Sequence, residues 1–403
     1  MPMTSRQRVI AAINHVQPDC VPIDFGGHRS SGIMAIAYRK LRGHLGLPER
    51  LPRVYDVIQQ LAIIDDDVLD RFGVDTIELG RGFSNDDRSW KPWRLPDGSD
   101  CLIPVWADLR KEGDDWYTIS ATGRRTGVQK AGSLYFEQIH WPFLEDIPDD
   151  LSGLPDAFAE VSWAVRSPPG PGADLAAGAK ALRSRTDRAI IGLFGGNLLE
   201  TGQMLCRNDN FLMLLAGEPR KAHRFLDSLV ELHLANLDAY LKAVGPHIDI
   251  ILFGDDLGMQ TGPQISPAMY REFFFPRHRA MWRRAKELAD VKVMLHCCGG
   301  VRELLPDLIE AGLDAINPVQ ITCAGMDAAG LKRDFGDRIC FWGGGCDTRQ
   351  ILPRGTPEQI RQHVRRQVGV LSPGGGFVFQ QVHNIMADVP PENVLAMFDA
   401  VRS

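Results

Sequence analysis

Residues 291–300 read Val-Lys-Val-Met-Leu-His-Cys-Cys-Gly-Gly, a mostly apolar run that ends in an imidazole, two thiols and two glycines. A continuous apolar run of this length is typical of a strand that is covered on both faces, as in a parallel sheet. The polar residues follow where the strand is expected to end. The stretch therefore predicts a buried parallel strand with reactive groups at its carboxyl end.

Similar apolar runs occur along the whole chain. Outward from 291–295 they are 249–253, 189–194, 76–79 and 21–25 on one side, and 315–316, 339–342 and 377–379 on the other. Helix-start signals lie between the later runs, since Ser266-Pro267 pairs a capping residue with a proline, and residues 356–359 form a capping box. Eight strands that alternate with helices predict an α/β fold, a (β/α)8 TIM barrel.

Two segments interrupt this alternation. Residues from about 88–142 contain five of the eight tryptophans and two turn signals, Pro96-Asp97-Gly98 and Thr122-Gly123, which indicate inserted antiparallel hairpins. Residues from about 165–175 are rich in proline and glycine and predict an exposed loop. We expect one barrel domain over residues 1–403 that carries both additions.

Composition excludes several classes of protein. The 403 residues are 44% hydrophobic and 24% charged, which suits a large globular core. A net charge of -6 gives no support to a nucleic-acid or anionic-membrane surface. No apolar run approaches the ~20 residues that cross a bilayer, and residues 1–8 lack the apolar core of a secretory signal. A cytoplasmic location is therefore the default expectation.

The cysteines are unevenly distributed, and five of the eight lie between residues 297 and 346. Side chains two apart on a strand share a face, so His296 and Cys298 should point together while Cys297 points away. Cys346 follows the run 339–342 after three glycines and is expected at the same end of the barrel. One imidazole and two thiolates suit zinc, and three protein ligands leave a catalytic position open. The alternative is that these cysteines are core residues, as we expect for Cys323 and Cys340.

Other polar side chains also follow predicted strands and are candidates for the same site. We expect roles in catalysis for Asp255, Glu78 and His383, and roles in substrate binding for Asp256, Asn384 and His28. Each has a structural alternative. Either aspartate can cap a helix (Asp256 more than Asp255), Glu78 can pair with an arginine, His383 can bond a loop, and His28 can cap a turn.

Several segments, taken in order, resemble the uroporphyrinogen decarboxylase superfamily along nearly the full chain. They are Gly-Asp-Asp-Leu-Gly at 254–258, Ser-Pro-Ala-Met-Tyr-Arg at 266–271, His-Cys-Cys-Gly at 296–299, Ile-Asn-Pro-Val-Gln at 316–320, Phe-Trp-Gly-Gly-Gly-Cys-Asp-Thr at 341–348 and Val-His-Asn-Ile at 382–385. The resemblance implies a (β/α)8 barrel with its site in the barrel mouth.

The superfamily has two chemical branches. Resemblance to the decarboxylase branch implies a metal-free enzyme that holds tetrapyrrole carboxylates with arginines of an N-terminal Arg-Gln-Ala-Gly-Arg motif. The matching residues 25–32 of this chain contain a single arginine, Arg29. The other branch resembles methylcobalamin:coenzyme M methyltransferases and related demethylases, which hold zinc with a His-x-Cys pair and a later cysteine. His296, Cys298 and Cys346 match that pattern, although the interval to the last cysteine is shorter.

The resemblance implies a zinc-dependent methyltransferase of the demethylase type. It would move a methyl group between a small methoxy or N-methyl compound and a corrinoid, either free cobalamin or a corrinoid protein. The residues alone leave two other functions open. One is decarboxylation of a polycarboxylate, which calls for an arginine cluster and no metal. The other is binding of a corrinoid or a metal without chemistry.

Overall fold

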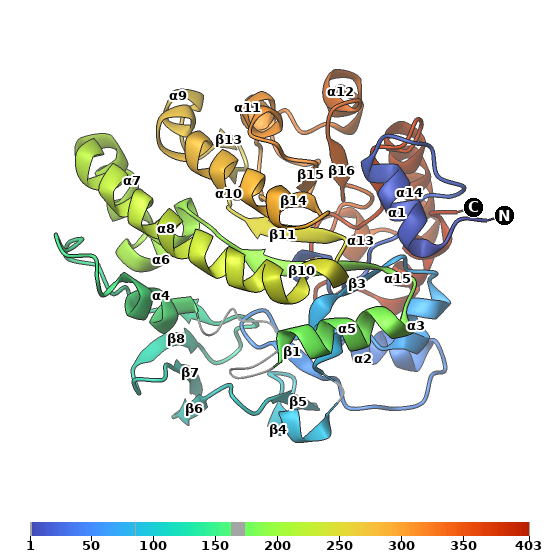
Figure 1. The fold of residues 1–403 in the computed structure, drawn as a ribbon. Helices are drawn as coiled ribbons and strands as arrows, with labels where there is room; N and C mark the ends of the chain where they lie inside the picture. The colour runs from blue at the N-terminus through green and yellow to red at the C-terminus, as the bar shows by residue number, and fades with distance from the viewer. Residues whose placement is uncertain (1, 85, 163–173, 403) are drawn as a thin grey trace.

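The computed structural model describes residues 2–84, 86–162 and 174–402. Most of the loop expected at about 165–175 lies outside the described residues, and Leu175 already begins helix α5 (Leu175–Arg185). Figure 1 shows a curled central sheet with helices around its outer side and a separate group of strands below it.

Seven parallel strands form the central sheet, in the order β17-β16-β15-β14-β11-β10-β3. They are β3 (Thr76–Glu78), β10 (Ala189–Gly195), β11 (Ile250–Gly254), β14 (Lys292–His296), β15 (Ala315–Asn317), β16 (Cys340–Trp342) and β17 (Phe377–Val378). Each strand falls on one of the apolar runs of the sequence. The sheet is curled as in a TIM barrel.

The remaining run, 21–25, lies between the two edges of this sheet. Asp24 N–H donates to Phe379 O, and Phe379 N–H donates to Pro22 O, both at 2.8 Å. On the other side Asp75 N–H donates to Ile23 O at 2.8 Å. The segment pairs as a single bridge rather than as a strand, because Pro22 has no N–H to donate to a ladder. It nevertheless joins the first and last strands, which gives a TIM-barrel-like closure.

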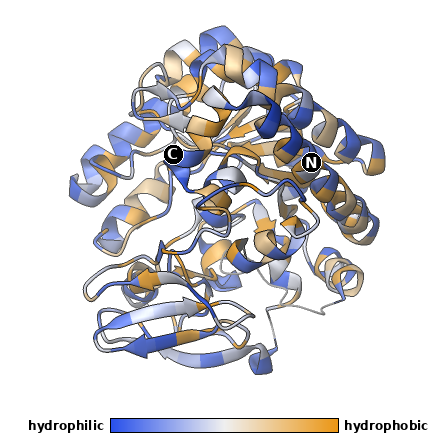
Figure 2. Cartoon of the chain, turned by 90° about the vertical axis from the view of Figure 1, so that its left-hand side faces the viewer, coloured by the Kyte–Doolittle hydropathy of each residue, from blue (hydrophilic) through white to orange (hydrophobic). Residues whose placement is uncertain are grey.

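Helices cover the outside of the sheet. In chain order they are α2 (Ala35–His44), α3 (Asp66–Arg71), α4 (Leu154–Ser162), α5, α6 (Leu199–Cys206), α7 (Asn208–Gly217), α8 (Pro219–Val244), α9 (Pro267–Met269), α10 (Phe275–Leu288), α11 (Leu305–Glu310), α12 (Ala328–Phe335), α13 (Ile351–Arg354), α14 (Pro357–Leu371) and α15 (Pro391–Asp399). Figure 2 shows apolar residues concentrated on the central strands and hydrophilic residues along the outer helices. This is the distribution that burial of one helix face requires.

Helix α1 (Ser5–Ile13) packs against the interior of the barrel rather than its outside. Its buried residues Val9, Ala12 and Ile13 form one cluster with side chains of six sheet strands. The strand members of this cluster are Ala189, Ile191, Ile250, Leu252, Met294, Ala315, Cys340, Trp342 and Val378. Because the cluster includes the first residues of β10, β11, β15 and β16, α1 plugs the amino end of the barrel and leaves the carboxyl end for a site.

The strands below the barrel in Figure 1 form antiparallel sheets. One pair is β4 (Trp90–Arg94) with β5 (Asp100–Pro104), and a four-stranded sheet contains β6 (Leu109–Glu112), β7 (Asp115–Ile119), β8 (Arg125–Gln129) and β9 (Glu137–Gln138). Phe143 N–H donates to Leu205 O, and the Tyr135 hydroxyl contacts Met386 Sδ at 3.0 Å. Since Leu205 and Met386 belong to segments that follow β10 and β17, the end of this region lies beside the carboxyl end of the barrel.

Two short antiparallel pairs complete the secondary structure, β1 (Val54–Asp56) with β2 (Leu61–Ala62) and β12 (Gly258–Met259) with β13 (Gly262–Pro263). Single helical turns occur at Arg29–Ser31, Leu79–Gly82, Asp87–Ser89, Gly245–His247 and Arg302–Leu304, and a π-helical turn at Tyr270–Phe274. None of the helices within the described ranges combines the length and apolarity needed to cross a membrane.

Candidate metal centre

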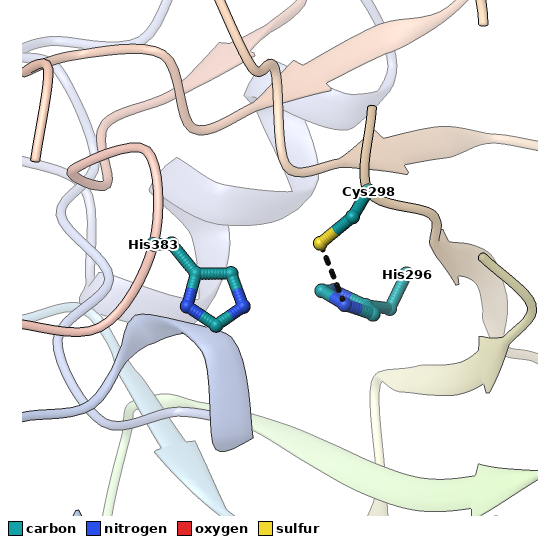
Figure 3. Close-up of side chains that lie close together, drawn as sticks. All are labelled: His296, Cys298 and His383. Atoms are coloured by element: carbon teal, nitrogen blue, oxygen red, sulfur yellow. Dashed lines mark hydrogen bonds between the residues drawn. The ribbon is translucent and has the colours of Figure 1, made fainter. Parts of the chain in front are cut away.

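Three potential ligands meet at the carboxyl end of the barrel: His296, Cys298 and His383. One ligand atom from each lies within 4.8 Å of the other two. The Cys298 sulfur is 3.4 Å from His296 Nε2, and the two imidazole rings have centroids 5.9 Å apart. Figure 3 shows the three side chains directed toward a common space between them. This is the only such group of three His, Cys, Asp or Glu side chains among the residues that the structure describes.

Strand β14 positions the first two ligands. His296 is its last residue and pairs in register with Gly254 on one side and Asn317 on the other. Met294, two residues earlier, belongs to the interior cluster, so His296 extends into the barrel one layer above it. Leu295 and Cys297 instead pack in the outer core, and Leu257 N–H donates to Cys297 Sγ at 3.3 Å.

The turn after β14 fixes the second ligand. Cys298 N–H donates to Asp256 Oδ1 at 2.7 Å, and Gly299 N–H donates to Gln320 Oε1 at 2.9 Å. Gly299 has a φ of +92° and lies against the backbone of Gly258, where a side chain at either position would overlap the other. Only glycine meets both requirements, which explains the glycine next to this cysteine.

His383 reaches the cluster from the segment after β17. Gly345 N–H donates to Gln380 O at 2.9 Å, and Val382 N–H donates to Cys346 O at 2.8 Å, so this segment continues beside the chain that follows β16. Burial, together with the neighbouring His296 and His28, lowers the pKa of His383 to about 3. His383 is therefore a neutral imidazole at physiological pH, the form that binds metal.

Cys346, the expected third ligand, is not part of this cluster. Its side chain is fully buried in the outer core, with its sulfur 4.0 Å from Asp347 O. Burial raises the pKa of this thiol well above its ordinary value. Three glycines separate Cys346 from β16, so the alternation of a strand does not set its side-chain direction. His383 takes the position that the sequence analysis gave to Cys346.

His296 and Cys298, the other two candidate ligands, lie in a polar and half-buried environment. His296 has 22% of its side chain exposed. Burial lowers its pKa, but Cys298, Asp256 and Asn317 together raise the pKa to about 10. Burial raises the pKa of Cys298, while the adjacent His296 opposes that rise. A proton and a divalent ion compete for these same atoms, so metal binding here would release protons.

Carboxyl groups lie close to the cluster on the side of β11. Asp256 Oδ1 is 3.6 Å from His296 Nε2, and 32% of the Asp256 side chain is exposed. Glu200 Oε2 accepts hydrogen bonds from Asp256 N–H at 3.0 Å and from Asn197 Nδ2. Burial, together with Asp256 and Asp255, raises the pKa of Glu200 to about 8. Asp256 therefore lies beside the cluster, and Glu200 is a buried carboxyl next to Asp256.

Glu78 ends β3 and is paired in register with Ile191, which belongs to the interior cluster. Its side chain consequently faces the barrel interior. Glu78 Oε1 accepts from Gly80 N–H at 3.3 Å, and burial raises the pKa of the carboxyl to about 7. Glu78 is thus a carboxyl that holds a proton close to neutral pH at the carboxyl end of the barrel.

Asp255, which the sequence suggested for catalysis, occupies a helix-capping position. Its carboxylate accepts three backbone N–H groups at the start of α6, from Leu198 at 3.2 Å, Leu199 at 3.0 Å and Glu200 at 2.9 Å. It also lies 3.2 Å from His278 Nε2 and is fully buried. A carboxylate at a helix N-terminus satisfies donors that have no partner within the helix. Asp255, not Asp256, is therefore the capping aspartate of the pair.

His28 and Asn384 were expected to contact substrate, and both are instead occupied by protein groups. His28 Nε2 lies 3.0 Å from Gln380 Oε1, while Ser30 N–H and Oγ bond its Nδ1. Asn384 Oδ1 accepts from Gly32 N–H at 2.9 Å, and its Nδ2 donates to Gln59 Oε1 at 3.0 Å. Both side chains are buried and fix the segment around residues 28–32.

Comparison with known proteins places this site in a family. Residues 175–403, more than half of the chain, match the family described as "Uroporphyrinogen decarboxylase (URO-D)". The chain belongs to the uroporphyrinogen decarboxylase family. The matched region contains six of the seven strands of the barrel sheet and all three candidate ligands of the cluster.

Curated relatives in this family fall into two kinds. One is a methylated-thiol–coenzyme M methyltransferase from Methanosarcina mazei, 33% identical over 160 residues, which are 39% of this chain and 39% of that protein. Another is a uroporphyrinogen decarboxylase from Psychromonas ingrahamii, 30% identical over 188 residues, 46% of this chain and 49% of that one. The chain thus spans between two fifths and half of the length of these relatives.

A solved structure described as a methyltransferase from Methanosarcina mazei is similar over nearly the whole chain. The TM-score is 0.58 at 17% sequence identity, with 99% of this chain and 98% of that chain covered. At this identity the likeness shows a shared fold. The shared fold also covers the residues before 175.

Several residues around the cluster were missed by the sequence analysis of this family member: Glu200, Ser30, Asn317 and Gln380. Asn317 is the last residue of β15 and Gln380 is the second residue after β17, so a search of every strand end for polar residues would have included them. Ser30 and Glu200 lie within helical turns, and their sequence carries no signal that distinguishes them from surface residues.

Proposed function

We propose that this chain is a metal-dependent methyltransferase that transfers a methyl group from a small methylated substrate to a corrinoid. His296, Cys298 and His383 would hold one zinc ion at the mouth of a single (β/α)8 barrel domain. The observation that carries the proposal is the convergence of two imidazoles and one thiol at the carboxyl end of the barrel, in a family that includes a methyltransferase.

The donor set fits zinc on its chemistry. Imidazole nitrogen and thiolate sulfur are the ligands that zinc takes most often in proteins. Three protein ligands are the number found in catalytic sites, where a further position is left for water or substrate. Within the described residues, His296 also meets a buried acceptor at its second nitrogen, as most zinc-bound histidines do.

Similarity supports methyl transfer as the reaction. The relative from Methanosarcina mazei is described by its name as acting on methylated thiols and coenzyme M. We extend only the reaction class to this chain, with a methoxy or N-methyl compound as donor and cobalamin, free or protein-bound, as acceptor. The antiparallel strands of the insertion at about 88–142 border the mouth and would form one side of the entrance for these reactants.

A bound zinc ion would supply Lewis acidity to the heteroatom that carries the methyl group. The chain's own residues have separate tasks. Asp256 holds the backbone of Cys298 in place and presents its exposed carboxylate beside the cluster. Glu78 keeps a proton near neutral pH, and we assign to it the protonation of the heteroatom as the methyl group departs to a cobalt(I) corrinoid.

The test is a methyl-transfer assay with a metal-loaded protein. Zinc-loaded chain, cob(I)alamin and one methylated compound are mixed, and methylcobalamin is followed by its absorbance. A methoxyarene, a methylamine, a betaine and a methyl thioether form the substrate panel. We expect methylcobalamin with one of these classes and none with Cys298→Ala. A wild-type chain that binds no zinc, or whose rate is unchanged in Cys298→Ala, would end the proposal.

Decarboxylation is the second candidate, because the Psychromonas ingrahamii relative carries that name and matches a longer stretch of the chain. It makes a different prediction. Release of carbon dioxide from uroporphyrinogen should not depend on His296, Cys298 or His383, since the family's decarboxylases are expected to work without a metal. Carbon dioxide release by both the wild type and Cys298→Ala would favour this candidate over methyl transfer. Binding of a corrinoid without either product would point to a non-catalytic protein.

A further inference from the structure

The two nitrogens of His296 have different surroundings. Nε2 faces the cluster, 3.4 Å from Cys298 Sγ. Nδ1 faces the protein, 3.0 Å from Asn317 Oδ1 and 2.9 Å from Ser30 Oγ. Asn317 and Ser30 are both buried, so water does not replace these contacts. Two protein side chains therefore hold the imidazole at Nδ1, the ring nitrogen that faces away from the cluster.

The orientation of the Asn317 side chain follows from its neighbours. Asn317 Nδ2 donates to the backbone carbonyl of Trp342 at 3.0 Å and to Gln380 Oε1 at 2.8 Å. A carbonyl oxygen can only accept, so the amide nitrogen of Asn317 must face it. The amide oxygen then faces His296 and also accepts from Ser30 Oγ at 2.9 Å. Because that oxygen only accepts, its 3.0 Å contact with His296 Nδ1 is a hydrogen bond when the proton is on Nδ1.

The side-chain amide of Gln380 fixes the orientation of the Asn317 amide. Gln380 Nε2 donates to the backbone carbonyl of Ser30 at 2.9 Å, so the amide oxygen of Gln380 must point the other way. Its Oε1 is left to accept from Asn317 and lies 3.0 Å from His28 Nε2. His28 Nδ1 contacts Ser30 Oγ at 2.9 Å, which closes the ring of contacts, and Asp24 Oδ2 lies 3.1 Å from His28 Nε2. All five side chains are buried, and a satisfied buried network of this kind holds its members in place.

We propose that Asn317, Ser30 and Gln380 are positioning residues of the metal centre, which keep a proton on His296 Nδ1 and leave Nε2 as the nitrogen that faces the ion. The inference rests on the proposed function for the identity of the ion. The arrangement of the proton does not depend on that function, because it follows from contacts within the chain. His28 and Asp24 do not contact His296. His28 contacts Ser30 and Gln380, and Asp24 contacts His28, so both act through those residues.

The test uses Asn317→Ala, which removes the acceptor of the Nδ1 proton. A buried asparagine of similar surroundings provides the control. Asn393 is buried in α15, and its Nδ2 donates to the carbonyls of Leu352 at 2.9 Å and Gly355 at 3.0 Å, without contact to the cluster. Asn393→Ala therefore removes a comparable pair of hydrogen bonds at another place.

The first measurement is made on metal-free protein labelled with ¹⁵N-histidine. The His296 signal is identified by its absence in His296→Gln. We expect a ring N–H at Nδ1 that exchanges slowly with water in the wild type and in Asn393→Ala, and rapidly in Asn317→Ala. An Nδ1–H that exchanges equally slowly in Asn317→Ala would overturn the inference.

The second measurement is zinc affinity by competition with a chromophoric chelator. We expect Asn317→Ala to bind zinc about 10- to 100-fold more weakly than Asn393→Ala, the range found when partners of metal-bound histidines are removed. Equal affinities would overturn the inference. If Asn317→Ala does not fold, Ser30→Ala serves instead, with faster Nδ1–H exchange expected and unchanged exchange as the contrary result. A wild type with a protected Nδ1–H but no zinc binding would contradict the proposed function alone.

Discussion

The backbone N–H of Cys298 donates a hydrogen bond of 2.7 Å to Oδ1 of Asp256, and so links the turn after β14 to the turn after β11. The two strands are neighbours in the sheet, and each supplies one partner at its carboxyl end. The position of the thiol thus depends on a carboxylate that is not itself in the cluster of three ligands.

We expect Asp256→Ala to weaken metal binding and Asp256→Asn to preserve most of it. Asparagine retains an oxygen that accepts from Cys298 N–H, whereas alanine leaves this donor without a partner, at a cost of roughly 1–3 kcal/mol. Titration with zinc and a competing chelator gives both affinities. Equal losses in the two variants would show that the negative charge of Asp256, and not its hydrogen bond, is what the site requires.

The identity of the third ligand is tested by one pair of variants. His383→Ala should lose zinc because it removes an imidazole from the cluster, and Cys346→Ala should retain it because that sulfur lies outside the cluster. Metal content after gel filtration is the measurement. The opposite result, zinc lost with Cys346→Ala and kept with His383→Ala, would restore the ligand set expected from the sequence.

A change at Gly299 should affect both stability and metal binding. The residue has a φ of +92°, and a Cβ there would overlap the backbone of Gly258. Gly98 is a matched control, since it has a φ of +84° with open space around it. Gly98→Ala should cost about 1 kcal/mol of stability for the strained backbone alone.

Gly299→Ala should cost clearly more than Gly98→Ala and should also move Cys298 away from His296. Urea unfolding compares the stabilities, and zinc content reports on the cluster. If the two variants lose the same stability and both keep zinc, the close approach of residues 258 and 299 is not a requirement of the site.

Glu78 should make stability depend on pH. Burial raises the pKa of its carboxyl from the ordinary 4.5 to about 7, so the folded chain holds a proton that the unfolded chain releases. This contribution is fully present below pH 4.5 and is lost as the pH rises through 7. Ionised Glu78 then costs up to roughly 3 kcal/mol.

We therefore expect Glu78→Gln to be more stable than the wild type at pH 8 and close to it at pH 4.5, as measured by urea unfolding. Glutamine keeps the oxygen that accepts from Gly80 N–H. Glu145→Gln, at an exposed position, reports the effect of removing a surface carboxylate. A gain for Glu78→Gln that is the same at both pH values would contradict the raised pKa.

Much of the fold could be predicted from the sequence, because parallel strands that are buried on both faces leave continuous apolar runs. Runs such as 249–253 and 339–342 became β11 and β16 with bounds that differ by one residue. The run at 21–25 formed only a bridge, since Pro22 interrupts the ladder. The pairing of residues 22–24 with both sheet edges is a tertiary property that no local pattern indicates.

The side-chain directions in the candidate site could be predicted from the sequence only along strand β14. His296 and Cys298 share a face because side chains alternate along β14, and this alternation could be derived from the sequence. His383 and Cys346 lie in irregular segments, where no period fixes the direction of a side chain, and there the cluster contains His383 in place of the expected Cys346. The sequence likewise favoured Asp256 as the capping aspartate, because only the folded chain shows that α6 begins beside Asp255.

Helix α1 fills the amino end of the barrel, so the reactants of the proposed methyl transfer would approach His296, Cys298 and His383 from the carboxyl end. A small methylated compound and a corrinoid protein would then share one side of the barrel, and a corrinoid protein bound there first would block the small compound. We therefore expect the small compound to bind before a corrinoid protein.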